Sequence, residues 1–300
     1  MFNKIMVPLD GSELAERALA PAKVLARESQ AELLLVRVLG RPPVFVPAEA
    51  GYGVLYADQS YAEALEQTRQ YLAGLRTALA ADGLGVRAEV LEGDVASEVV
   101  DSARRAQASL MIMSSHGYSG VKRWLLGSVA AKVLPAAPCP VWVVRTAGAP
   151  RNLLLTLDGS PLAEQALAPA LAVARCFGTA VTLLRVVPEL GASEFRSLEK
   201  LEAGMAPRFV EEAREAAADY LALIADRCGN EGLELKTVVR SGPAADTILE
   251  YAEQNAVDLV AMTTHGRTGL RRWLYGSVTQ KVLDRLPCSL LVAHPARGEV

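Results

Sequence analysis

Apolar and polar positions alternate along this chain in a way that predicts strands and helices in turn. Short apolar runs bounded by Gly, Pro, Asp or Ser are typical of buried strands in a parallel sheet. Between them, apolar residues spaced three and four positions apart indicate amphipathic helices. The predicted strands are residues 4–9, 31–39, 86–91, 110–113 and 140–144, followed by 153–157, 181–187, 235–239, 259–262 and 289–293.

Two stretches break this pattern. Residues 40–58 and 188–207 contain Pro and Gly and show no clean period, so we expect loops longer than the usual connection. Each precedes a long predicted helix, ending near Asp82-Gly83 in the first case and running through Phe209 in the second. A helix is also expected directly after Ser12, with Ala20-Pro21 as a local irregularity.

The chain contains an internal repeat. The 13 residues from Asp10 match those from Asp158 at 11 positions, and the 24 residues from His116 match those from His265 at 14 positions. The offsets of 148 and 149 residues indicate that one whole unit is duplicated. We therefore predict two domains, residues 1–147 and 148–300. Each is expected to be an α/β fold of the Rossmann-like kind, an open five-stranded parallel sheet with helices on both faces.

Composition narrows the class of protein. Of 300 residues, 51% are apolar and 22% are charged, which is typical of a globular chain. The net charge is only −3 and the basic residues are dispersed, so we expect neither nucleic acid nor a membrane as partner. The start of the chain lacks a basic region followed by an apolar stretch, which predicts a cytoplasmic location. The four cysteines show no CxxC pair and are interpreted as structural.

The strongest candidate for binding chemistry is a duplicated glycine loop. MSSHGYSGVKRWLLGS from Met113 and MTTHGRTGLRRWLYGS from Met262 each predict the end of a strand, a loop and the start of a helix. Loops at the carboxyl ends of parallel strands hold phosphates, because free N–H groups and the positive helix end point there. Asp10, at the end of the first strand, would suit a ribose hydroxyl or a magnesium ion. The alternative is that the glycines are turn residues and Ser128 is only a helix cap.

Catalysis is the less favoured interpretation. Asp10, His116 and Ser128 are residue types used in nucleophilic catalysis, but no GxSxG motif occurs. Neither a GxxxxGK[ST] loop nor GxGxxG is present. We therefore predict no catalytic residue, and expect His116 and His265 to orient their loops.

These residues carry a family resemblance. VPLDGSELAERAL, LLLVRV and SSHGYSGVKRWLLGSVAAKVLPAAPCPVWVV, each with a counterpart in the second half, resemble a tandem member of the universal stress protein (UspA-like) family. Nucleotide-binding members of that family carry G-x2-G-x9-G-[ST]. The last three elements of this motif stand here as Gly117, Gly127 and Ser128, and as Gly266, Gly276 and Ser277, whereas Ser114 and Thr263 replace the first glycine.

The resemblance implies a fold of the adenine nucleotide alpha hydrolase type, with ATP and magnesium as ligands. By the same resemblance Asp10 and Asp158 lie by the ribose or metal, Val38 and Val186 offer backbone groups to the adenine, and the motif region extends to Val129 and Val278. The implied function is a stress-response protein regulated by nucleotide, without turnover or with slow ATP hydrolysis. The resemblance also implies pairing of the two domains through their last strands, and a dimer of chains.

Two alternatives stay open from the sequence. One is a nucleotide-free module of the same fold that serves dimerisation and partner contact, favoured by Ser114 and Thr263 at the first-glycine position. The other, weaker one is a hydrolase that uses Asp10 and His116.

Overall fold

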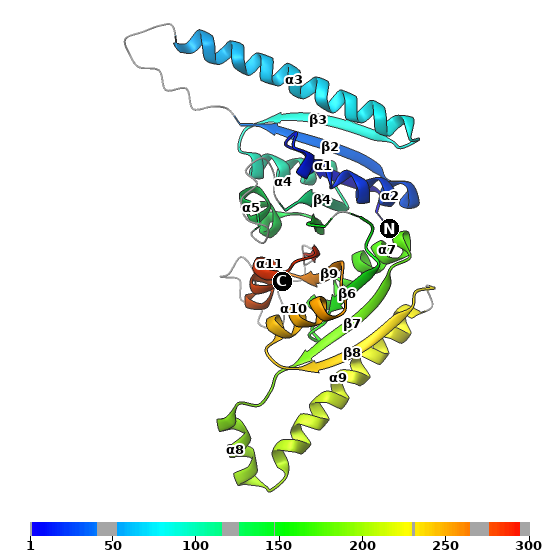
Figure 1. The fold of residues 1–300 in the computed structure, drawn as a ribbon, viewed down its shortest axis with the longest axis vertical. Helices are drawn as coiled ribbons and strands as arrows, with labels where there is room; N and C mark the ends of the chain where they lie inside the picture. The colour runs from blue at the N-terminus through cyan, green and yellow to red at the C-terminus, as the bar shows by residue number, and fades with distance from the viewer. Residues whose placement is uncertain are drawn as a thin grey trace. The chain divides into compact units, whose positions relative to one another are not determined.

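The chain divides into two compact units, Met1–Gly148 and Ala149–Val300. The computed structural model describes residues 2–40, 53–115, 126–146, 148–229, 232–264 and 276–294. Each unit contains one five-stranded parallel sheet with helices on both faces, which confirms the predicted fold class (Figure 1). In the described ranges, no helix has the length and apolar character needed to cross a membrane.

In the first unit the strands lie in the order β3-β2-β1-β4-β5. The chain steps from β1 to β3 in one direction and then returns to add β4 and β5 on the other side. Right-handed crossovers therefore place α1 to α3 on one face and α4 and α5 on the other. The strands are β1 (Lys4–Pro8), β2 (Glu32–Leu39), β3 (Val86–Glu92), β4 (Leu110–Ser114) and β5 (Val141–Val144), and the helices are α1 (Glu13–Glu16), α2 (Leu19–Ser29), α3 (Gly53–Ala81), α4 (Val95–Ala106) and α5 (Ser128–Ala136).

The second unit repeats this plan with the order β8-β7-β6-β9-β10. Figure 1 shows its long helix α9 running beside β8, as α3 runs beside β3 in the first unit. The strands are β6 (Asn152–Thr156), β7 (Ala180–Val187), β8 (Leu235–Ser241), β9 (Leu259–Thr263) and β10 (Ser289–Ala293), and the helices are α6 (Pro161–Glu164), α7 (Leu167–Phe177), α8 (Ala192–Leu201), α9 (Met205–Gly229), α10 (Ala244–Gln254) and α11 (Ser277–Arg285).

The central strands form the core of each unit. Ile5, Met6 and Val7 of β1 have no exposed surface, and Leu153, Leu154 and Leu155 of β6 are at most 1% exposed. Helices cover both faces of these strands, so side chains pointing either way are buried. The apolar runs in the sequence are therefore continuous rather than alternating.

The helix expected after Ser12 is two helices. α1 ends at Glu16 and α2 begins at Leu19, so that Pro21 falls in the first turn of α2. A proline is tolerated in a first turn because the N–H it lacks would have no intrahelical partner there. The second unit breaks in the same way between α6 and α7, where Pro169 occupies the matching place.

The two stretches expected to be long loops contain helix. α3 begins at Gly53, so residues 53–58 are helical, while residues 41–52 lie outside the described residues. In the second unit α8 occupies part of the expected loop and α9 begins at Met205. α8 has no buried residue, and its apolar side chains, Phe195, Leu198 and Leu201, stay at least partly exposed.

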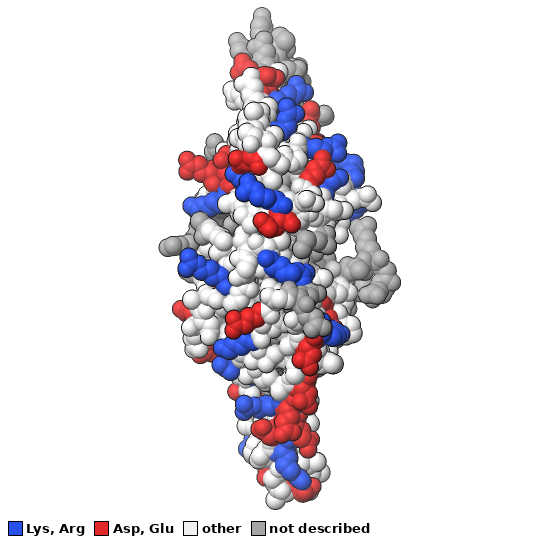
Figure 2. Space-filling view, turned by 90° about the vertical axis from the view of Figure 1, so that its right-hand side faces the viewer, with Lys and Arg blue, Asp and Glu red and all other residues white. Residues whose placement is uncertain are grey.

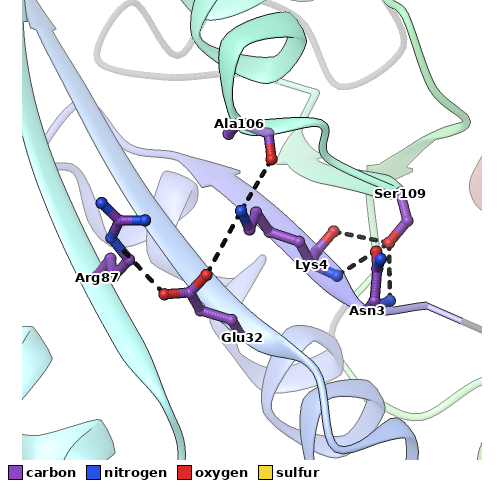
Figure 3. A network of polar contacts seen from close by, with 6 residues as sticks. All are labelled: Asn3, Lys4, Glu32, Arg87, Ala106 and Ser109. Atoms are coloured by element: carbon purple, nitrogen blue, oxygen red, sulfur yellow. Dashed lines mark hydrogen bonds and ion pairs between the residues drawn. The ribbon is translucent and has the colours of Figure 1, made fainter.

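Hydrogen bonds of one side chain, here called the polar staple, join the amino ends of neighbouring strands: Ser109 does so for β1 and β4, and Asp258 for β6 and β9. The Ser109 hydroxyl accepts hydrogen bonds from the N–H groups of Asn3 and Lys4 at 3.0 and 3.1 Å and donates to the Lys4 carbonyl at 2.8 Å (Figure 3). In the second unit, Asp258 Oδ2 accepts from the N–H groups of Arg151 and Asn152 at 2.8 and 3.0 Å. Equivalent pairs of strands are thus joined by a hydroxyl in the first unit and by a carboxylate in the second.

The same network reaches the neighbouring strands and helix. Lys4 Nζ lies 3.6 Å from Glu32 and donates to the Ala106 carbonyl at 2.9 Å, and Glu32 in turn lies 3.7 Å from Arg87 (Figure 3). These contacts connect β1, β2, β3 and the end of α4 at the amino edge of the sheet. The opposite, carboxyl edge carries the candidate site.

Candidate functional site

The candidate site of each unit lies where the sheet changes its winding direction. β1 pairs directly with β4, with Ile5 opposite Leu110. From β1 the chain leaves toward β2, whereas from β4 it leaves toward β5 on the other side. In open parallel sheets, connections that diverge in this way leave a crevice outside the carboxyl ends of the two strands. β6 and β9 form the same switch point in the second unit.

A tight turn after β1 holds Asp10 at this edge. The Ser12 N–H and hydroxyl both donate to Asp10 Oδ1, at 2.9 and 2.6 Å, while Ser12 Oγ accepts from the Ala15 N–H at 3.1 Å and caps α1. Asp158 Oδ1 likewise accepts from the Ser160 N–H at 2.9 Å. Such aspartate turns fix the carboxylate relative to its own backbone. Both aspartates are half-buried, so their orientation is set before any ligand arrives.

The glycine loop after β4 has its two ends joined. The Gly127 N–H donates to the Ser115 carbonyl at 2.7 Å, and the Gly276 N–H donates to the Thr264 carbonyl at 2.8 Å. The loop therefore leaves and re-enters the sheet edge at one point in each unit. Part of the predicted site falls outside the described residues, namely Gly117, Gly266, His116, His265, Lys122, Arg123, Trp124, Arg271, Arg272 and Trp273.

The helices that follow these loops begin without a side-chain cap. Gly127 is the N-cap of α5 and Gly276 the N-cap of α11, and neither offers a side-chain acceptor to the first N–H groups. By contrast, α1, α4 and α6 are capped by Ser12, Asp94 and Ser160. The interpretation of Ser128 as the cap was wrong, because Ser128 is the first helical residue and is exposed. An open helix start of this kind favours an anion.

The remaining predicted residues lie on neighbouring elements of the same edge. Val38 and Val186 are half-buried near the carboxyl ends of β2 and β7, the strands beside β1 and β6. Val129 and Val278 are half-buried in the first turns of α5 and α11, next to the exposed serines Ser128 and Ser277.

The first-glycine positions differ between the units. Thr263 is the last residue of β9 and only 6% exposed, and the Thr279 hydroxyl donates to its carbonyl at 3.0 Å. Ser114 is half-buried at the end of β4. Thr279 takes the place of Ala130 in the first unit, so the end of β9 is bound to α11 by a hydrogen bond for which the first unit has no matching side chain.

A duplicated cluster behind the aspartate turn was not anticipated from the sequence. Arg37 of β2 places its guanidinium 5.3 Å from the centre of the Tyr71 ring, and the Tyr71 hydroxyl donates to Glu16 at 2.9 Å. In the second unit Arg185 takes the place of Arg37, Tyr220 that of Tyr71 and Glu164 that of Glu16. The recurrence of all three residues at offsets of 148 or 149 was the signal that could have identified them.

Charges of both signs are mixed on the face of the molecule that Figure 2 draws. Within the described ranges, no group of three His, Cys, Asp or Glu side chains is arranged to hold a metal ion. At the described part of the site, the open helix starts are features that could attract an anion.

Comparison with known proteins identifies the family. The model of the universal stress protein family matches residues 1–145 and again residues 150–294. The chain belongs to the universal stress protein family. The predicted recognition of a tandem member is confirmed, because relatives of this family align with both halves.

Two relatives illustrate the single and the tandem form. Universal stress protein YxiE of Bacillus subtilis is 37% identical over 150 residues, which covers 48% of this chain and 100% of that protein. A universal stress protein of Mycolicibacterium smegmatis is 28% identical over 306 residues and covers 97% of both chains.

Solved structures share the fold. Protein PA1789 of Pseudomonas aeruginosa has a TM-score of 0.71 at 21% identity, with 98% of this chain and 93% of that chain covered. A universal stress protein of Archaeoglobus fulgidus has a TM-score of 0.64 at 20% identity, with 97% and 98% covered.

Proposed function

We propose that this universal stress protein binds one ATP, with magnesium, in each unit and acts in the stress response as a nucleotide-regulated protein rather than by turnover. The observation that carries the proposal is the pairing, at one switch point, of a fixed aspartate turn with a helix start that has no side-chain cap. The pairing occurs in both units. A helix start is a site for phosphate and a carboxylate is a partner for ribose hydroxyls, so together they fit a nucleotide.

The residues then divide the ligand between them. The N–H groups of Ser128 and Val129, with the Ser128 hydroxyl, would hold phosphate oxygens, each contact contributing about 0.3–1 kcal/mol when exposed. Asp10 would bind the ribose or the magnesium ion, and the backbone of Val38 the adenine. In the second unit these roles go to Ser277, Val278, Asp158 and Val186. Gly117 and Gly266, following the family motif, would let the phosphates approach the backbone.

Magnesium fits the proposal as a companion of the phosphates. It prefers octahedral oxygen ligands and keeps several waters, so one carboxylate and the phosphate oxygens suffice. The ion would neutralise part of the phosphate charge next to Asp10 or Asp158.

The two sites are expected to be unequal. Thr263 is β-branched and buried at the first-glycine position, and its strand end is tied to α11 by Thr279. Ser114 is smaller and half-buried. We expect the second unit to bind ATP more weakly than the first.

Slow or absent hydrolysis follows from the role of Ser128. A serine in the first turn of a helix is placed to donate to phosphate, which in this proposal gives Ser128 a binding role. Turnover by Asp10 and His116 would instead require phosphate release that disappears when both are replaced. Pairing of the two units, a dimer of chains and the cytoplasmic location stay predictions from the sequence.

The test is nucleotide content and stoichiometry. Purified protein is denatured in acid and its released nucleotides are identified by mass spectrometry, and the nucleotide-free protein is then titrated with ATP and magnesium in a calorimeter. We expect two ATP per chain, with Gly127→Leu or Gly276→Leu each removing one. Gly85→Leu is the control, because a Cβ added there meets nothing within 4 Å. No bound nucleotide and no heat up to millimolar ATP would refute the proposal and favour the interaction module.

A further inference from the structure

The turn that carries Asp10 rests on an arginine from the neighbouring strand. Gly11 has φ of +85°, and a Cβ built there would lie 2.6 Å from Arg37 Nη1 and 3.0 Å from Arg37 Cζ. The guanidinium therefore packs against the backbone of the turn with no room for a side chain between them. In the second unit a Cβ on Gly159, also at φ +85°, would lie 2.9 Å from Arg185 Nη2.

The arginine is itself held in place from its other side. Its guanidinium lies over the ring of Tyr71, and Arg185 lies 4.8 Å from the centre of the Tyr220 ring. Cation–π contacts of this kind restrict a long side chain to one orientation. The tyrosine hydroxyls donate to Glu16 at 2.9 Å and to Glu164 at 3.2 Å, so that each ring is anchored to the helix that follows the turn.

The glutamate is fixed more firmly in the second unit. Arg227 of α9 donates to Glu164 Oε2 at 2.7 Å, while Tyr220 of the same helix donates to Oε1. The cluster thus joins three elements in each unit: the long helix, the strand beside the turn and the short helix that the turn begins. All of these groups are half-buried except the exposed guanidinium of Arg227.

The protonation state of the tyrosines keeps this arrangement constant. Burial, followed by the hydrogen bond and the charge of Glu16, raises the pKa of Tyr71 above its ordinary value. Burial and the charge of Glu164 raise the pKa of Tyr220 to about 12. Both phenols therefore remain hydrogen-bond donors at neutral pH.

We infer that Arg37 and Arg185 are positioning residues for the ribose end of the two sites: each guanidinium holds the aspartate turn in the conformation that directs Asp10 or Asp158 at the ribose hydroxyls. This inference rests on the proposed function. Arginine suits the role because its planar group stacks on an aromatic ring and packs against a backbone at once, which a lysine ammonium cannot do.

Arg37 is thereby linked to one part of the ligand, the ribose hydroxyls. If Arg37 acts through Asp10 on the ribose, replacing it affects ATP but not 2′,3′-dideoxy-ATP, which lacks both ribose hydroxyls. If Arg37 serves only stability, both ligands are affected equally. The two ligands therefore separate positioning from a general structural effect.

The experiment measures both affinities by calorimetry in the full chain. The background variant Gly276→Leu leaves the first site as the reporter. Arg37→Met is expected to weaken ATP about tenfold, and 2′,3′-dideoxy-ATP by less than about twofold. Arg37→Lys keeps the charge and is expected to restore part of the loss. The mirror experiment places Arg185→Met in the Gly127→Leu background.

The second unit supplies a matched control. Arg240 lies 5.6 Å from the centre of the Tyr251 ring, a similar contact on β8 and α10 away from the aspartate turn. Arg240→Met is expected to leave both affinities unchanged. Thermal unfolding of every variant shows which of them remain folded, and Arg37→Lys takes the place of Arg37→Met if the latter unfolds.

The outcomes separate this inference from the proposed function. Equal weakening of ATP and 2′,3′-dideoxy-ATP, or no weakening of either, would overturn the positioning role while nucleotide binding stands. A background variant that binds neither ligand, together with a wild-type chain that binds no ATP, would remove the proposed function and this inference with it.

Discussion

At the scale of single residues, Gly11 makes the sharpest prediction about stability. Its φ of +85° and the 2.6 Å approach of Arg37 mean that Gly11→Ala adds both backbone strain and a steric clash. Gly83 has φ of +80°, and a Cβ there meets nothing within 4 Å, so that Gly83→Ala adds the strain alone. We expect losses of about 2–3 kcal/mol and about 1 kcal/mol respectively in the free energy of unfolding, measured with urea. Equal losses would show that the Arg37 side chain moves away from the added methyl group without a cost in free energy.

Tyr220 makes a prediction about alkaline pH. Its pKa of about 12 in the folded unit exceeds the value of about 10 expected when unfolded, mainly because of burial. The folded state therefore binds the phenolic proton more tightly, and this contribution to stability is present below pH 10 and is lost as the pH rises through 12. Between pH 9 and about 12, the free energy of unfolding should fall less steeply with pH for Tyr220→Phe than for the wild-type chain. Parallel curves would show that Tyr220 titrates alike in both states.

Single residues also show where sequence reasoning ends. Asp10 and Gly127 could be identified because both lie in short motifs that recur in the second half of the sequence. Arg37 could not be assigned a role, because its partners Gly11 and Tyr71 are distant in sequence and meet only when β2 and α3 pack beside the turn. A repeat shows which residues recur, but not which of them touch.

At the scale of elements, the polar contacts that join β1 to β4 in the first unit differ in strength from those that join β6 to β9 in the second. Asp258 accepts two backbone N–H groups with one carboxylate oxygen, and Ser109 does so with a neutral hydroxyl. Hydrogen bonds to a charged acceptor are the stronger ones, so we expect Asp258→Ala to cost about 2–3 kcal/mol and Ser109→Ala about 1–2 kcal/mol. Asp258→Asn keeps an acceptor oxygen and is the control. Urea unfolding decides, and a smaller loss for Asp258→Ala than for Ser109→Ala would contradict the ranking.

Elements with a buried face were predictable and those without one were not. β4 was expected at residues 110–113 because the side chains there form an unbroken apolar run. In the structure the strand ends one residue later, at Ser114. α8 was missed because its apolar spacing, through Phe195, Leu198 and Leu201, is short and lies within a stretch that contains Gly and Pro. The break between α1 and α2 was marked by Pro21, but whether a proline ends a helix or begins the next depends on what the flanking turns pack against.

At the scale of the whole molecule, duplication gives each unit its own candidate site, so that each unit serves as a reference for the other. Hydrogen exchange followed by mass spectrometry assigns protection to peptides of one unit or the other without separating them. With ATP and magnesium we expect slower exchange in α5 and in the turn at Asp10, and in α11 and the turn at Asp158, because bound phosphate and ribose hold the amides of these segments.

Gly276→Leu should abolish the slower exchange in the second unit alone, and Gly127→Leu in the first alone, while Gly85→Leu changes neither. At limiting ATP the first unit should be protected before the second, since Thr263 is buried and β-branched where the first unit has Ser114. Protection that disappears from both units in either glycine variant would contradict independent sites.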